Sequence, residues 1–180
     1  KDIRVIFPAR SMSELQRIVS DEDGDITLVI GENQALVKTE DYTFTTRLID
    51  GQYPDYQQVI PPNHKTRAVL PVAEFTKAVK AASLFAPSGV NDIHLSFHPD
   101  RREVEVAASS GQVGENKIVV AGDVSGDANS IVFNWRYLME GVDRIKTNQA
   151  VVDLVNATSP GVLRPKDEAN YTYLIMPMNR

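Results

Sequence analysis

A spacing of 63 residues, found twice along a chain of 180 residues, limits most strongly how this chain can fold. Phe7, Leu70 and Phe133 occupy the same place in three segments that open alike. The segments read "RVIFPARSMSELQRIV" from residue 4, "RAVLPVAEFTKAVKAA" from residue 67 and "SIVFNWRYLMEGVDRI" from residue 130. Self-similarity at a fixed period indicates one supersecondary unit that is used three times.

Each opening segment predicts a short strand followed by a helix, because an apolar run passes into helical spacing. We expect helices over residues 8–20, 71–84 and 134–147. Their apolar stripes are Met12, Leu15 and Val19; Phe75, Val79 and Ala82; and Leu138, Val142 and Ile145. Ser11 or Ser13 is the expected cap of the first helix, and Asn134 of the third.

Three strands are expected after each helix. In the second unit, Ile93, Leu95 and Phe97 alternate with polar residues, as a sheet with one dry face requires. The expected strands are 25–31, 34–40 and 42–49; then 92–98, 102–109 and 116–122; then 149–156, 161–167 and 170–176. The fold class is therefore α+β, with repeated βαβββ units and helices on one face of antiparallel sheets. Two units make a domain of about 115 residues.

Composition excludes several classes of protein. The chain has no cysteine, so disulfides and thiolate chemistry are excluded. No apolar run is long enough to cross a bilayer, which predicts a cytoplasmic protein without a membrane partner. No phosphate-binding loop, dinucleotide fingerprint or nucleophile elbow is present, so we expect a protein that is not an enzyme, with no metal and no cofactor.

The expected helices differ in charge from the rest of the chain. They carry seven basic and four acidic residues, a net +3, whereas the whole chain has a formal charge of −5. A mildly basic helical face fits a surface that meets phosphates without gripping them. The alternative is a chance imbalance on solvated helices.

Two stretches carry a family resemblance. The segment "DGQYPDYQQVIP" (50–61) and the terminal "YLIMPMNR" (173–180) resemble the bacterial DNA polymerase III beta subunit, a sliding clamp. The resemblance covers all 180 residues. It implies the DNA clamp fold, with residues 1–62 as the C-terminal half of the middle domain and 63–180 as the complete third domain. It also predicts that this chain is a piece of a longer protein.

The resemblance implies a replication processivity factor that encircles duplex DNA without reading its sequence. Polymerase, clamp loader and repair proteins are then expected to bind a groove through linear peptide motifs containing glutamine, leucine and an aromatic residue. The implied groove residues are Pro54, Gln58, Val59, Asn134, Tyr137, Pro160, Leu174, Met176, Pro177 and Met178. The expected DNA-facing residues are Arg10, Arg17, Lys77, Lys80 and Arg136.

The resemblance also implies a head-to-tail homodimer of the full-length protein. Its ring interface would include Ser83, Leu84 and Phe85, and we expect the present chain alone to be monomeric. The alternative interpretation is a generic α+β protein-interaction module unrelated to replication. A hydrolase built from clustered Ser, His and Asp is a third hypothesis, since triad members meet in space rather than in sequence.

Overall fold

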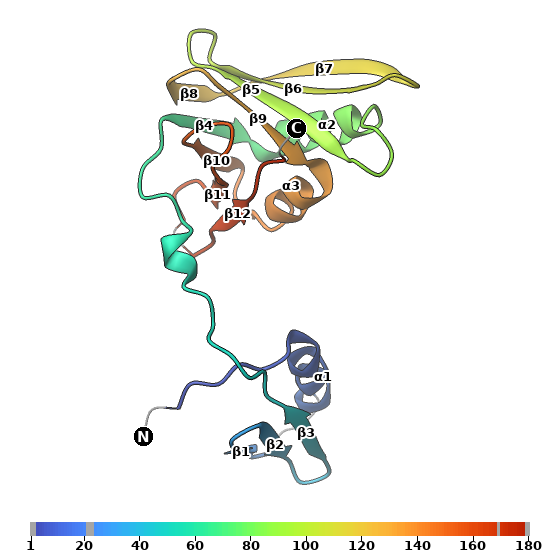
Figure 1. Ribbon diagram of the computed structural model, residues 1–180, viewed down its shortest axis with the longest axis vertical. Helices are drawn as coiled ribbons and strands as arrows, with labels where there is room; N and C mark the ends of the chain where they lie inside the picture. The colour runs from blue at the N-terminus through green and yellow to red at the C-terminus, as the bar shows by residue number, and fades with distance from the viewer. Residues whose placement is uncertain (1–2, 21–23, 169, 179–180) are drawn as a thin grey trace. The chain divides into compact units, whose positions relative to one another are not determined.

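The computed structural model describes residues 3–20, 24–168 and 170–178. It divides into two compact units, Lys1–Asp55 and Tyr56–Arg180, which are described separately (Figure 1). No helix among the described residues is long and apolar enough to cross a membrane.

The first unit contains one helix and one antiparallel sheet. The elements are α1 (Ala9–Val19), β1 (Thr27–Ile30), β2 (Gln34–Lys38) and β3 (Thr43–Arg47), with the strands in the order β1-β2-β3. Ala35 and Val37 of β2 are buried. The Thr46 hydroxyl on β3 donates to Ser11 Oγ on α1 at 2.8 Å, which ties the helix to the sheet.

Two expectations for the first unit are wrong. Residues 4–7 form no strand: the Ile6 carbonyl accepts a bond from the Ile49 N–H at 2.9 Å, but no ladder of strand pairing forms there. The cap of α1 is Pro8, not Ser11 or Ser13, which lie inside the helix. Proline suits this place because its ring fixes φ, here −61°, while its carbonyl still accepts the first helical bond.

In the described part of the second unit lie two antiparallel sheets, two α-helices and one short 3-10 helix, η1 (Figure 1). The five-stranded sheet has the order β12-β11-β10-β4-β8, and the four-stranded sheet has the order β7-β6-β5-β9. The elements are η1 (Tyr56–Gln58), β4 (Thr66–Pro71), α2 (Val72–Ser83), β5 (Asp92–His98), β6 (Glu103–Ser110), β7 (Gly114–Ala121), β8 (Asp123–Gly126), β9 (Asn129–Asn134), α3 (Trp135–Val142), β10 (Gln149–Leu154), β11 (Gly161–Pro165) and β12 (Tyr173–Ile175). This arrangement confirms the α+β fold class.

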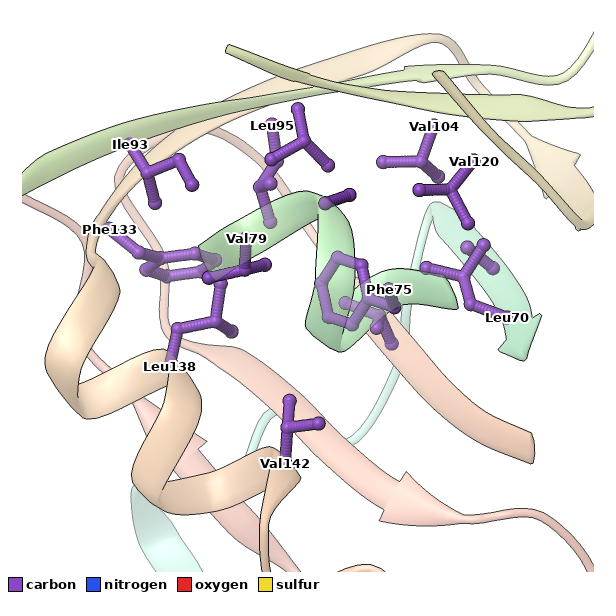
Figure 2. Packing of buried hydrophobic residues seen from close by; sticks show 14 of the residues in the cluster. Leu70, Phe75, Val79, Ile93, Leu95, Val104, Val120, Phe133, Leu138 and Val142 are labelled. Atoms are coloured by element: carbon purple, nitrogen blue, oxygen red, sulfur yellow. The ribbon is translucent and has the colours of Figure 1, made fainter. Parts of the chain in front are cut away.

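The predicted apolar stripes form the core of the second unit. Figure 2 shows Phe75 and Val79 of α2 lying against side chains from the strands, with Phe133 and Leu138 beside them. Phe75, Val79 and Leu138 are fully buried. Helix α3 is shorter than predicted, since it ends at Val142 and not at residue 147. There the Ile145 N–H bonds the Val142 carbonyl in a tighter turn that still buries Ile145.

Strand β8 was not predicted. It follows β7 directly and pairs with β4, from Thr66 opposite Gly126 to Val69 opposite Asp123. Gly126 has a φ of +86°, and a Cβ there would collide with the Lys65 carbonyl oxygen. A glycine is therefore required where the two strands approach each other.

Candidate functional site

The carboxyl-terminal segment is held at two places with an exposed residue between them. Ile175 ends β12 and is buried, and Gly161 of β11 lies opposite it. Met176 follows with 63% of its surface exposed. Beyond Pro177, the Met178 N–H donates to the Val132 carbonyl on β9 at 2.8 Å. The segment is thus both the last strand of a sheet and a fixed, exposed apolar surface.

Helix α3 is tied to this segment by two tyrosine hydroxyls, one near its start and one near its end. The Tyr173 hydroxyl donates to the Tyr137 carbonyl at 2.9 Å, and the Tyr171 hydroxyl donates to the Gly141 carbonyl at 3.0 Å. The rings of Tyr171 and Tyr173 stack with their centroids 6.5 Å apart. Tyr137 itself is 57% exposed, so α3 presents an aromatic side chain on a helix that the tail anchors.

Burial raises the pKa of both anchoring tyrosines. For Tyr173 the nearby carboxylate of Glu140 raises the pKa further. For Tyr171 the guanidinium of Arg144 acts in the opposite direction but is the weaker influence. The protein environment therefore favours the protonated, hydrogen-bond-donating form of both hydroxyls.

Asn134 is the cap of α3, as predicted from the sequence. Its side-chain oxygen accepts a hydrogen bond from the Arg136 N–H at 3.0 Å, in the position that a capping residue takes. That oxygen is thereby used in holding the helix start. The nitrogen of the same side-chain amide is a hydrogen-bond donor.

The other predicted groove residues of this unit lie on loops and strand ends. Pro160 is half-buried and follows a turn in which the Asn156 side chain accepts bonds from the Thr158 and Ser159 N–H groups. Leu174 is half-buried on β12. Gln58 ends η1 and is exposed, and Val59 after it is 50% exposed. Pro54 belongs to the first unit.

The five predicted DNA-facing residues are all exposed on helices: Arg10 and Arg17 on α1, Lys77 and Lys80 on α2, and Arg136 on α3. Two of them have local partners. Arg17 pairs with Glu14 at 2.9 Å, and the Arg136 guanidinium lies 5.3 Å from the Trp135 ring centroid. Lys77 and Lys80 are three residues apart and share one helix face.

The three predicted ring-interface residues differ in their surroundings. Leu84, just after α2, is 74% exposed. The Ser83 hydroxyl donates to the Lys80 carbonyl at 2.8 Å, and Phe85 packs against the core. Leu84 is therefore the member of this set that offers an apolar surface to solvent.

Sequence reasoning missed a group of charged residues on the five-stranded sheet. Asp153, whose side chain is 7% exposed, accepts bonds from Arg67 Nε at 2.6 Å and from Nη2 at 2.9 Å. Arg164 and His64 lie 3.7 Å and 4.0 Å from the same carboxylate. The residues of this group are up to 100 positions apart in the sequence, so no local sequence pattern predicts that they meet.

Matches to known protein families cover both units of the structure. Residues 57–179 match the C-terminal domain of the DNA polymerase III beta subunit, and residues 1–55 match the central domain of the same subunit. The chain belongs to the DNA polymerase III beta subunit family.

Individual relatives agree with this assignment. The beta sliding clamp of Staphylococcus aureus (strain Mu50) is 35% identical over 176 residues, which is 97% of this chain and 46% of that protein. The chain thus spans about half the length of the curated relatives it matches. A Bacillus subtilis DNA polymerase sliding clamp is 28% identical with a TM-score of 0.85, covering 100% of this chain and 48% of that one. A Pseudomonas aeruginosa sliding clamp bound to griselimycin is 26% identical with a TM-score of 0.84, covering 98% and 47%.

Proposed function

We propose that this chain is part of a sliding clamp that encircles duplex DNA and tethers replication proteins to it. The observation that carries the proposal is membership of the DNA polymerase III beta subunit family over both units. The helices add physical support, because Lys77, Lys80 and Arg136 are exposed on a chain whose overall charge is −5. Few cations on an acidic protein allow weak, sequence-independent contact with phosphates, which permits sliding.

The proposal assigns residues 63–180 to the third clamp domain and residues 1–62 to the C-terminal half of the middle domain. The protein acts as a non-catalytic subunit in the cytoplasm, where its DNA is. Full-length subunits join head to tail through the surface around Leu84. The present chain alone is monomeric and does not load onto DNA. Sedimentation velocity tests this point, and a stable closed dimer of the chain would contradict it.

Docking of partner peptides is assigned to the surface around Met176 and Tyr137. Both side chains are more than half exposed, yet both stand on backbone that is held in place by hydrogen bonds. A pre-formed apolar surface lowers the entropic cost of binding. Methionine side chains adapt to different partners, which suits a site that serves several proteins.

Replacing Met176 with alanine tests the docking surface. We expect the affinity for a labelled peptide with a glutamine, leucine and aromatic motif to fall by about tenfold, because an exposed Met side chain buried by the ligand contributes roughly 1 to 2 kcal/mol. Thermal unfolding should stay unchanged, since Met176 is 63% exposed. Fluorescence polarisation measures the affinity.

The matched control is Leu84→Ala, which removes an apolar side chain that is also more than half exposed, from the proposed ring interface. Its peptide affinity should equal that of the parent chain. Equal losses in both variants, or no loss with Met176→Ala, would remove the support for the docking assignment.

A further inference from the structure

A hollow of about 190 Å³ opens beside the charged group on the five-stranded sheet. Its lining includes Pro62, His64, Arg67, Asp153, Val162 and Arg164, all within the second unit. Asp153 lies at the buried side, while the side chains of Arg67, Arg164 and His64 are 35% to 40% exposed. Solvent therefore reaches the guanidinium groups and the imidazole more easily than the carboxylate between them.

Among the charged side chains at this hollow, positive charge exceeds negative charge, because two guanidinium groups meet one carboxylate. One carboxylate faces two guanidinium groups and one imidazole. Arg67 uses Nε and one terminal nitrogen on Asp153, which leaves its other donors available. Arg164 approaches Asp153 only to 3.7 Å and donates no side-chain hydrogen bond to any residue that the structure describes. A second oxyanion would balance the charge and accept these bonds.

The strand register connects this hollow to the proposed docking surface. Arg67 lies opposite Asp153, Asp153 opposite Val162, and Val162 opposite Leu174. Directly opposed residues of antiparallel strands point to the same face, so these four form one row across β4, β10, β11 and β12 (Figure 1). Two strand spacings separate Leu174 from Asp153, about 10 Å, which about three residues of extended peptide can span.

We infer that the hollow between His64, Arg67 and Arg164 binds a carboxylate side chain of the docked partner peptide, a few residues outside its apolar motif. This inference rests on the proposed function. It gives the docking site a second, polar specificity element that reads an acidic flank. The chain as a whole carries −5, so general electrostatic attraction would disfavour such a flank, and a preference for it requires a local cationic site.

Three labelled peptides with the same apolar motif test the inference. One carries three glutamates before the motif, one carries three glutamates after it, and one carries glutamines at both places. We expect one of the two acidic peptides to bind about three- to tenfold tighter than the glutamine peptide, with the gain shrinking as salt rises.

Arg164→Gln should abolish most of this gain and leave the glutamine peptide's affinity unchanged. Arg164 is suited to the test because it holds no short bond to Asp153, so its loss leaves the bidentate pair between Arg67 and Asp153 intact. Arg101→Gln, at the ion pair with Glu103 on a different sheet, is the charge-matched control and should keep the full gain.

The outcomes separate the two proposals. If the glutamine peptide fails to bind the parent chain, the docking function itself fails. If it binds but neither acidic peptide binds more tightly, or if Arg164→Gln keeps the gain, the carboxylate site is wrong while docking stands. Difference NMR mapping of the acidic against the glutamine peptide on the parent chain gives an independent measurement. Shifts confined to residues 62–64, 153–155 and 162–164 would support the site, and shifts elsewhere would overturn it.

Discussion

Replacing Gly141 with alanine sets two opposing effects against each other at the junction of α3 and β12. Gly141 is buried in α3, and its carbonyl accepts the Tyr171 hydroxyl. A Cβ there would lie 2.7 Å from Cε1 and 2.9 Å from Cγ of the Tyr173 ring. Helix propensity alone favours alanine in the middle of a helix by about 1 kcal/mol.

The steric effect is the larger one. The colliding atoms belong to the body of the ring, not to the end of a flexible side chain, so either the helix or β12 has to move. Overpacking of this kind costs about 1 to 3 kcal/mol. The bond from Tyr173 to the Tyr137 carbonyl would be lost or lengthened, at a cost of about 1 kcal/mol. We therefore expect Gly141→Ala to destabilise the protein by roughly 1 to 3 kcal/mol in spite of its better helix propensity.

Urea denaturation followed by circular dichroism measures this change. The same substitution in a Tyr173→Leu background supplies the control, because without the ring the alanine penalty should shrink or reverse. The affinity for the motif peptide should fall together with stability in the single variant, since Tyr137 and the tail would separate. A higher denaturation midpoint for Gly141→Ala alone would show that propensity outweighs packing here and would refute the argument.

Two further predictions concern charge. Arg67→Ala should destabilise the protein by about 2 to 4 kcal/mol, since it leaves the Asp153 carboxylate buried without its bidentate partner. Arg102→Ala, at an exposed ion pair, should cost less than about 1 kcal/mol. Urea denaturation compares the two variants, and equal losses of stability would contradict the distinction between buried and exposed pairs. Because the folded state raises the pKa of Tyr171 and Tyr173, their contribution is fully present below the unfolded value of 10.0 and is lost as pH rises through the folded pKa. Thermal unfolding between pH 8 and about 11 should show this loss, and Tyr173→Phe should make it smaller; an unchanged slope in that variant would count against it.

Periodicity predicted the parts of the fold where local sequence and packing agree. The α2 stripe of Phe75, Val79 and Ala82 is buried as expected, and Asn134 caps α3 through its side chain. Periodicity gave the wrong element bounds where contacts between distant parts of the chain determine the structure. The predicted length of α3 rested on Ile145, which is indeed buried but in a turn beyond the helix. At Ile145 the apolar spacing thus indicated burial but not helix, whereas in α1 the stripe of Met12, Leu15 and Val19 is helical but only half-buried.

The docking residues of the candidate site could be predicted only from the family resemblance. The motif at residues 50–61 and the carboxyl-terminal segment contain no residue pattern that by its chemistry alone indicates a peptide-binding site. Met176 lies exposed between the end of β12 at Ile175 and the bond from the Met178 N–H to β9, a pairing that no local pattern contains.

The Asp153 group shows why register limits such reasoning. Arg67 and Asp153 are 86 residues apart, and they meet because β4 and β10 pair with these two positions opposite each other. A slip of one residue would turn Asp153 toward the core and Arg67 away from it, leaving a buried carboxylate without a cation. The bidentate pair thus helps to fix the register of β4 against β10. The row from Arg67 to Leu174 also needs two further registers, β10 against β11 and β11 against β12, and no local pattern in the sequence specifies how the three combine.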